Sequence, residues 1–228
     1  MIIGGLQKMT MLDFPGKVAC TIFTQGCNFK CPFCHNRGLV VGQKDIITEE
    51  EIFAYLKKRV GILDGACVTG GEPLLQKDIF EFLKKIKDTG LLVKLDTNGY
   101  LPDKLRYAIE NGLVDYVAMD IKNCPDKYAQ TSGVDNLDIE NIKESVNILK
   151  EGKVPYEFRT TVTKELHTKE DLKKIGEWIC GAEAYYIQNY RDSENVLCKG
   201  LSSLENQELN ALLNAVLPYV PAAALRGI

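Results

Sequence analysis

The amino-acid sequence predicts an α/β protein in which strands and helices alternate along the chain. Three observations support this prediction. Short runs rich in β-branched and aromatic residues recur six times, helical apolar patterns lie between and after them, and glycine or proline marks many of the boundaries. Strict alternation implies a parallel sheet joined by right-handed crossovers. No linker rich in Pro, Gly or Ser interrupts the pattern, so we expect residues 1–228 to form a single domain.

The expected strands are apolar runs that stop at turn residues or at the start of a helix pattern. The first of them is followed by a long irregular stretch before the first helix. In chain order they are Val18–Phe23, Gly65–Thr69, Leu91–Asp96, Val114–Ile121, Tyr156–Val162 and Ala184–Tyr190.

Each expected helix is recognised by an apolar stripe together with a start or stop signal. The first begins with a capping box of Thr48 and Glu51, the second stops at Gly90, the third has Pro102 in its first turn, and the last is capped by Ser203. The stripes that we could assign are Ile52, Tyr55, Leu56 and Val60; Ile79, Phe82, Leu83 and Ile86; Ile142, Val146 and Leu149; Leu172, Ile175 and Ile179; and Leu209, Leu212, Leu213 and Val216.

Six β/α units leave two architectures open, an open doubly wound sheet and a barrel-like sheet. A complete eight-unit barrel typically needs about 250 residues, so six units would leave a barrel incomplete. We predict an incomplete (β/α)6 TIM-type barrel of parallel strands and keep the doubly wound sheet as the alternative.

The composition excludes several classes of protein. Lys and Arg number 28 against 31 Asp and Glu, a net charge of −3, so there is no basic footprint for nucleic acid or an anionic membrane. The most apolar stretch, residues 209–225, contains Asn214, Pro218 and Pro221, whereas a membrane span needs about 20 apolar residues. The first ten residues lack a signal-peptide pattern, so we expect the reducing cytoplasm, where disulfides are rare.

Three of the eight Cys are crowded together as Cys27, Cys31 and Cys34, just after the first expected strand. A structural zinc site would usually take four ligands in two separated pairs, and no second pair follows. The spacing of Cys31, Cys34 and His35 also matches c-type haem attachment, which would leave Cys27 unused. An iron–sulfur cluster suits three thiolates, with one iron left open for a substrate or cofactor. The other five Cys are expected to be buried small hydrophobes.

The spacing C-x-x-x-C-x-x-C, with Phe33 before the last Cys, resembles the signature of the radical S-adenosylmethionine (SAM) superfamily. The resemblance implies a [4Fe-4S] cluster bound by Cys27, Cys31 and Cys34, whose open iron chelates the amino and carboxylate groups of SAM. It implies no acid or base catalyst. It assigns SAM contacts to Phe33, Cys34, His35, Gly70, Gly71, Glu72, Pro73, Asp96, Thr97, Asn98, Asp120, Lys122, Arg159, Gln188 and Arg191.

These contacts follow the expected strands, at the edge where parallel α/β folds place their sites. Glu72, in the GGEP segment, would hold the methionine amino group, although a simple turn would explain its glycines equally well. Asp96 and the pair Asp120 and Lys122 would surround the methionine carboxylate and ribose, and the acids could also hold a monovalent cation. The purely structural alternatives are an Asn-Gly turn in the DTNG segment and an internal ion pair between Asp120 and Lys122.

Some assignments are less direct. The segment of Phe33 and His35 would pack against the adenine. Gln188 or Arg191 would replace a His that formate-lyase activases carry after the sixth strand. Arg159 would bind the SAM carboxylate or pair with an acid.

The DTNG and MDIK segments are similar to those of activases of glycyl radical enzymes, and the chain most resembles the activating proteins of anaerobic ribonucleoside-triphosphate reductase. The resemblance implies reductive cleavage of SAM and radical formation on a glycine of a partner enzyme. A low-potential donor such as flavodoxin or ferredoxin would supply the electron. The alternatives are a pyruvate formate-lyase-type activase, a small-molecule enzyme similar to 7-carboxy-7-deazaguanine synthase, and a non-catalytic zinc module.

Overall fold

The computed structural model describes residues 1–42 and 46–227 of the chain. These residues form one mixed sheet of eight strands with helices around it. The strands are β1 (Ile3–Thr10), β2 (Ala19–Thr24), β3 (Gly65–Gly70), β4 (Leu92–Thr97), β5 (Tyr116–Asp120), β6 (Tyr156–Val162), β7 (Tyr185–Asn189) and β8 (Ala223–Arg226).

The strands lie in the sheet in the same order as in the chain. All neighbours from β2 to β8 pair in parallel, and β1 alone runs antiparallel, beside β2. Within the described residues no pairing joins β1 to β8, so the curved sheet stays open on one side. The prediction of an incomplete TIM-type barrel is therefore confirmed, and the open doubly wound sheet is excluded.

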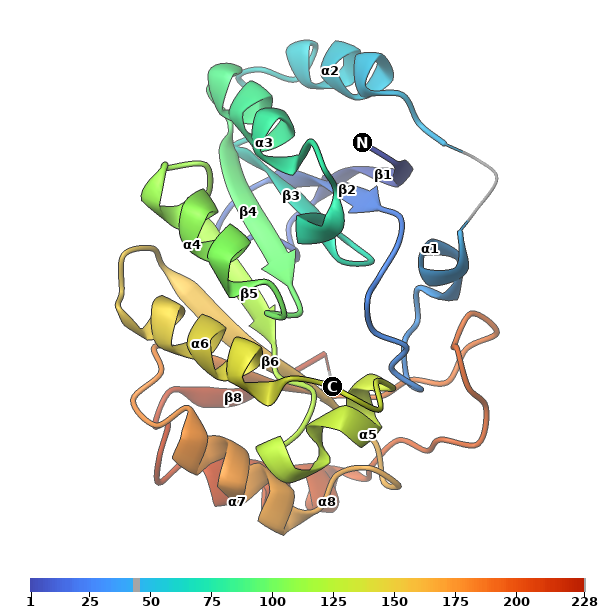
Figure 1. Ribbon diagram of the computed structural model, residues 1–228, viewed down its shortest axis with the longest axis vertical. Helices are drawn as coiled ribbons and strands as arrows, with labels where there is room; N and C mark the ends of the chain where they lie inside the picture. Colours follow the sequence, from blue (N-terminus) through green and yellow to red (C-terminus); the bar gives the residue numbers. More distant parts are fainter. Residues whose placement is uncertain (43–45, 228) are drawn as a thin grey trace.

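The helices are α1 (Arg37–Val41), α2 (Glu49–Lys57), α3 (Ile79–Asp88), α4 (Pro102–Glu110), α5 (Tyr128–Ser132), α6 (Ile139–Lys150), α7 (Lys169–Trp178) and α8 (Asn206–Val216). In Figure 1, α3, α4, α6 and α7 lie outside the curve of the sheet, while the short helix α1 lies on its other side. None of those described is long and apolar enough to cross a membrane.

Most of the expected helix signals are confirmed. Thr48 and Glu51 form the capping box of α2. The four apolar residues predicted to face inward on α3 are each at most 1% exposed. Two details were wrong. Val60 lies beyond the end of α2 and is 57% exposed. The capping box of α8 is formed by Glu205 and Glu208, so the helix begins after Glu205 rather than at Ser203.

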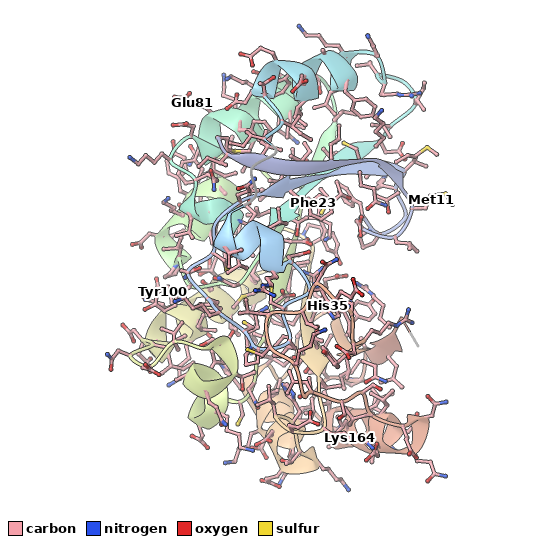
Figure 2. All side chains as sticks on the ribbon, turned by 90° about the vertical axis from the view of Figure 1, so that its right-hand side faces the viewer. Met11, Phe23, His35, Glu81, Tyr100 and Lys164 are labelled. Atoms are coloured by element: carbon pink, nitrogen blue, oxygen red, sulfur yellow. The ribbon has the colours of Figure 1, made fainter. Side chains whose placement is uncertain are left out.

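Two edge strands, β1 and β8, were not predicted. The first contains Gly4 and Gly5 and lacks a clear apolar alternation, and the second has only four residues. They flank the six predicted units and extend the sheet without closing it. The carboxyl ends of β2 to β7 consequently meet at one edge of the sheet, as expected for parallel strands. In Figure 2, His35 lies between the β1–β2 hairpin above it, whose turn is at Met11, and Lys164 below it.

Candidate active site

A cavity of about 260 Å³ lies at the carboxyl edge of the strands. Its wall contains residues from the ends of β3 to β7 and from the loop that follows β2, here called the cluster loop and defined as residues 25–36. Of the residues expected at the site, it is lined by Cys27, Cys31, Phe33, Cys34, His35, Gly70, Gly71, Asp96, Thr97, Asn98, Asp120, Lys122, Arg159 and Gln188. Segments up to about 160 residues apart thus converge as the motifs suggested.

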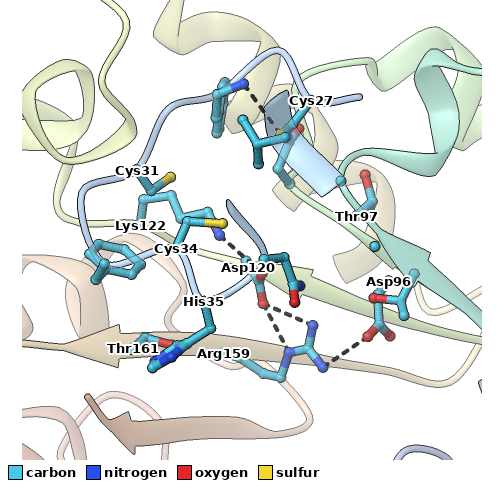
Figure 3. A pocket seen from close by; sticks show the side chains of 18 of the residues that line it. Cys27, Cys31, Cys34, His35, Asp96, Thr97, Asp120, Lys122, Arg159 and Thr161 are labelled. Atoms are coloured by element: carbon cyan, nitrogen blue, oxygen red, sulfur yellow. Dashed lines mark hydrogen bonds and ion pairs between the residues drawn. The ribbon is translucent and has the colours of Figure 1, made fainter. Parts of the chain in front are cut away.

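The three thiols of the cluster loop face this cavity (Figure 3). Burial raises the pKa of Cys27 to about 11 and that of Cys31 to about 12, so iron binding must displace their protons. Among the described residues, no three His, Cys, Asp or Glu side chains are placed to hold a single metal ion. A [4Fe-4S] cube does not need its thiolates to converge on one point, because each thiolate ligates a different iron. Three separated thiols around one cavity therefore fit a [4Fe-4S] cluster and not a single zinc ion.

Gly70 and Gly71 let the end of β3 pack against the start of the cluster loop. A Cβ on Gly71 would lie 2.0 Å from the carbonyl oxygen of Gly26, and one on Gly70 would lie 2.4 Å from the backbone of Thr24. Gly70 also has a φ of +120°. The sequence suggested close approach to a ligand, but the structure shows close approach to backbone. These glycines position Cys27 as well as lining the cavity.

Glu72 is fully buried and connects β3 to β4. Its carboxylate accepts hydrogen bonds from the backbone of Leu74 (3.1 Å), the hydroxyl of Thr97 (2.9 Å) and the backbone of Asn98 (2.7 Å). Burial raises its pKa to about 7, with these three donors opposing the shift. Glu72 and Pro73 are not among the residues that line the cavity. Glu72 thus holds the DTNG segment in place.

A network of charged side chains lies beneath the cavity, on the interior of the sheet. Arg159 bridges two carboxylates, with 2.9 Å from its guanidinium to Asp120 and 3.3 Å to Asp96. Lys122 lies 3.0 Å from Asp120, and Lys94 pairs with Asp96. The network, which we call the upper ion cluster, contains three cations and two anions and has a surplus of one positive charge.

The electrostatics of the upper ion cluster favour charged side chains despite burial. Burial by itself would raise the pKa of Asp120, but the Arg159 guanidinium and the Lys122 ammonium hold it below its usual range. For Asp96 the opposing groups are Arg159 and Lys94, and its pKa is likewise lowered. Both carboxylates stay ionised and already have cationic partners. The geometry supports the ion-pair interpretation of Arg159 and leaves a net positive charge beside the cavity.

Other predicted residues fall into two groups. Phe33 is buried with its ring 6.2 Å from that of His167, and the His35 ring lies 5.5 Å from that of Tyr190. Gln188 lines the cavity, but Arg191 does not. Its guanidinium instead donates to the backbone carbonyl of Gly227, and its side chain lies in a neighbouring surface hollow. Of the two candidates after β7, only Gln188 is therefore placed at the site.

Sequence reasoning missed Lys94 and Thr161. Thr161 lines the cavity, and Lys94 is 1% exposed beneath it. A signal was available, because residues two apart on a strand share a face. Lys94 is two positions before Asp96 on β4, and Thr161 is two positions after Arg159 on β6.

Comparisons with known proteins identify the family of the chain. A family model described as the radical SAM superfamily matches residues 21–179. A Methanocaldococcus jannaschii protein named as a glycyl-radical enzyme activating enzyme is 33% identical, covering 100% of this chain and 96% of its own. A Thermococcus kodakarensis protein named as a GTP 3′,8-cyclase is 34% identical over 64% of this chain. This chain matches only 48% of the cyclase's length.

A solved structure agrees with the fold. A domain of pyruvate-formate lyase-activating enzyme from Bacteroides vulgatus superposes with a TM-score of 0.57, covering 72% of this chain and 99% of that domain. The identity is 18%, so this likeness concerns the arrangement of strands and helices and nothing finer.

Proposed function

The chain belongs to the radical SAM superfamily, and we propose that it activates a glycyl radical enzyme, most specifically an anaerobic ribonucleoside-triphosphate reductase. One observation carries the proposal. The side chains of the DTNG and MDIK segments, which resemble those of activases, lie at the same cavity as the three thiols. The similarity to the Methanocaldococcus protein along the whole chain supports the same conclusion.

The cluster loop holds the group that defines the superfamily. Cys27, Cys31 and Cys34 would bind a [4Fe-4S] cluster, leaving one iron for SAM. When bound and reduced, the cluster would supply one electron for cleavage of the SAM sulfonium to methionine and a 5′-deoxyadenosyl radical, which would take a hydrogen atom from glycine. The burial of Cys31 and its neighbours keeps water away from this region.

The residues around the cavity orient SAM. The surplus positive charge of the upper ion cluster attracts the methionine carboxylate, with Lys122 and Arg159 fixed by Asp120 and Asp96. Gly70 and Gly71 offer backbone atoms to the amino group, and Glu72 holds their segment against Thr97 and Asn98. His35 and Gln188, which both line the cavity, contact the adenine.

The partner is a protein, so the open side of the sheet serves as the route for a polypeptide loop. A low-potential donor such as flavodoxin or ferredoxin reduces the cluster. We place the protein in the cytoplasm and assign residues 1–228 to a single radical SAM domain. No acid or base side chain is needed for the reaction.

Electron paramagnetic resonance under anoxic conditions tests the proposal. Reduced protein is mixed with SAM and, separately, with anaerobic ribonucleotide reductase or pyruvate formate-lyase. We expect a glycyl radical doublet with the reductase. The Cys31→Ala variant should give none, and Cys20→Ser, a buried thiol away from the cavity, should retain it. A doublet only with pyruvate formate-lyase would reassign the partner. No doublet with either enzyme, despite SAM cleavage, would contradict activation and favour a small-molecule substrate.

A further inference from the structure

The three thiols of the cluster loop do not have equal surroundings. The sulfur of Cys27 accepts from the backbone N–H of Phe29 at 3.3 Å and lies 3.9 Å from the side-chain nitrogen of Asn98. Within the described residues, no N–H donor makes a corresponding hydrogen bond to the sulfur of Cys31 or Cys34. The positive charge of the Lys122 ammonium instead acts on Cys31 and favours its thiolate. One thiolate is thus singled out for hydrogen bonding.

The orientation of the Asn98 amide follows from its own partners. Its oxygen accepts from the backbone N–H of Tyr100 at 3.0 Å, so its nitrogen must be the end that faces the cluster loop. That nitrogen donates to the side-chain oxygen of Asn28 at 2.8 Å and has a second hydrogen for Cys27. The Asn98 backbone is fixed by Glu72 at 2.7 Å. Asn98 is 5% exposed, which keeps water from competing.

We propose that Asn98 is a positioning residue that raises the reduction potential of the cluster by donating an N–H to the Cys27 thiolate. This inference rests on ligation by Cys27 in the proposed function. Hydrogen bonds to cluster sulfurs are one of the factors that set its potential. Reduction adds negative charge to the cluster, and an N–H dipole directed at a ligating sulfur stabilises that charge. Glu72 fixes the backbone of Asn98, and the Asn98 side chain contacts the Cys27 sulfur. The DTNG segment, which lies at the SAM cavity, is therefore held rigidly against the thiolate.

Two substitutions separate this effect from packing. Asn98→Leu has a similar volume and no donor, so the midpoint potential should fall. Asn98→Asp keeps the acceptor for Tyr100 but places a carboxylate beside the sulfur, so the potential should fall further. Asn210→Leu makes the same change at an exposed Asn of α8 that donates to the Asn206 carbonyl and does not line the cavity, and the potential should stay at the wild-type value.

The potential is measured by anoxic redox titration followed by electron paramagnetic resonance, without SAM or a partner protein. Electron–nuclear double resonance in H₂O and D₂O should also show one fewer exchangeable proton near the cluster in Asn98→Leu. Unchanged potentials in both Asn98 variants, with full iron content, would overturn the proposal. Loss of the cluster in both would also overturn it, assigning Asn98 to assembly instead. Because no glycyl radical enzyme is present, these outcomes are independent of the partner's identity.

Discussion

Two ion clusters lie on the same interior face of the sheet, and they differ in charge and in access. The upper ion cluster borders the cavity and has three cations for two anions. The lower ion cluster is centred on Glu157, two residues before Arg159 on β6. Arg226 binds its carboxylate at 2.7 and 2.9 Å, and the Tyr116 hydroxyl donates to it at 3.1 Å.

The lower ion cluster is balanced and does not line the cavity. Glu157 is fully buried, and Arg226 stacks 3.5 Å from the centre of the Tyr186 ring. Its charges satisfy one another and tie β8 to the rest of the sheet. Buried charge alone therefore does not indicate a binding site. A surplus of charge that faces a cavity indicates a ligand of opposite sign, whereas a closed pair serves the fold.

The largest effect is expected from Arg159→Leu, in the upper ion cluster. Removing the guanidinium leaves Asp96 and Asp120 short of a partner and removes the surplus positive charge. A charged hydrogen bond contributes about 1.5–3 kcal/mol, so SAM affinity should fall roughly tenfold to a hundredfold. Isothermal titration calorimetry on the reconstituted protein measures this affinity for SAM. Unchanged affinity would break the distinction between the two clusters.

Arg226→Leu is the matched change in the lower ion cluster. Breaking the partner of a buried carboxylate is strongly destabilising, but Arg226 is itself 32% exposed. We therefore expect the free energy of unfolding to fall by about 2–3 kcal/mol, with SAM affinity unchanged. Denaturant titration and calorimetry check the two halves of this prediction. A loss of SAM affinity equal to that of Arg159→Leu would show that the lower cluster also serves binding.

Glu72 differs from both clusters in its response to pH, because it is a buried carboxylate held by neutral hydrogen-bond donors rather than by an ion pair. Its pKa rises from an ordinary 4.5 to about 7 on folding. Between these values the folded state binds more protons than the unfolded state, so stability should decrease as pH rises from 4.5 to 7. At about 1.4 kcal/mol per pKa unit, the decrease is on the order of 3 kcal/mol.

Unfolding of the cluster-free protein at a series of pH values measures this slope. The Glu72→Gln variant should show a flatter dependence, while Glu140→Gln, at an exposed position, should retain the wild-type slope. An equally steep dependence in Glu72→Gln would assign the titration to another group.

The smallest effect is expected at an exposed pair, Lys174 and Asp126, which lie 2.7 Å apart on the surface. Solvent screens such pairs, so Lys174→Ala should leave both SAM affinity and unfolding within experimental error of the wild type. A clear loss in either measurement would mean that an ion pair can contribute to stability or to SAM binding through proximity alone, without burial.

Periodicity predicted the six β/α units because each amphipathic helix and each apolar strand carries its own local pattern. The capping box at Thr48 and the buried stripe of α3 are examples. The edge strands β1 and β8 lack such a pattern, and pairing with β2 and β7 holds them in the sheet. Whether β8 closes on β1 depends on the curvature of the whole sheet, which no short segment specifies.

The candidate site was predictable where a motif fixes residue type and spacing, as for Cys27, Cys31 and Cys34. Contacts between motifs were not predictable. Asn98 reaches Cys27 across 71 residues, and Glu72 reaches Asn98 across 26. Arg191 shows the opposite case, since its place after the sixth expected strand suggested a contact with the adenine, but its side chain donates to the carbonyl of Gly227. Such pairings depend on the folded backbone.

The proposed function requires three thiolates that hold a cluster whose fourth iron takes SAM. This requirement is tested by electron paramagnetic resonance of the anoxically reconstituted, reduced protein, recorded before and after adding SAM. We predict a signal of a reduced [4Fe-4S] cluster that changes shape when SAM is added and is absent when Cys27, Cys31 and Cys34 are all Ala. A signal that survives the triple change, or that SAM leaves unaltered, would contradict the claim.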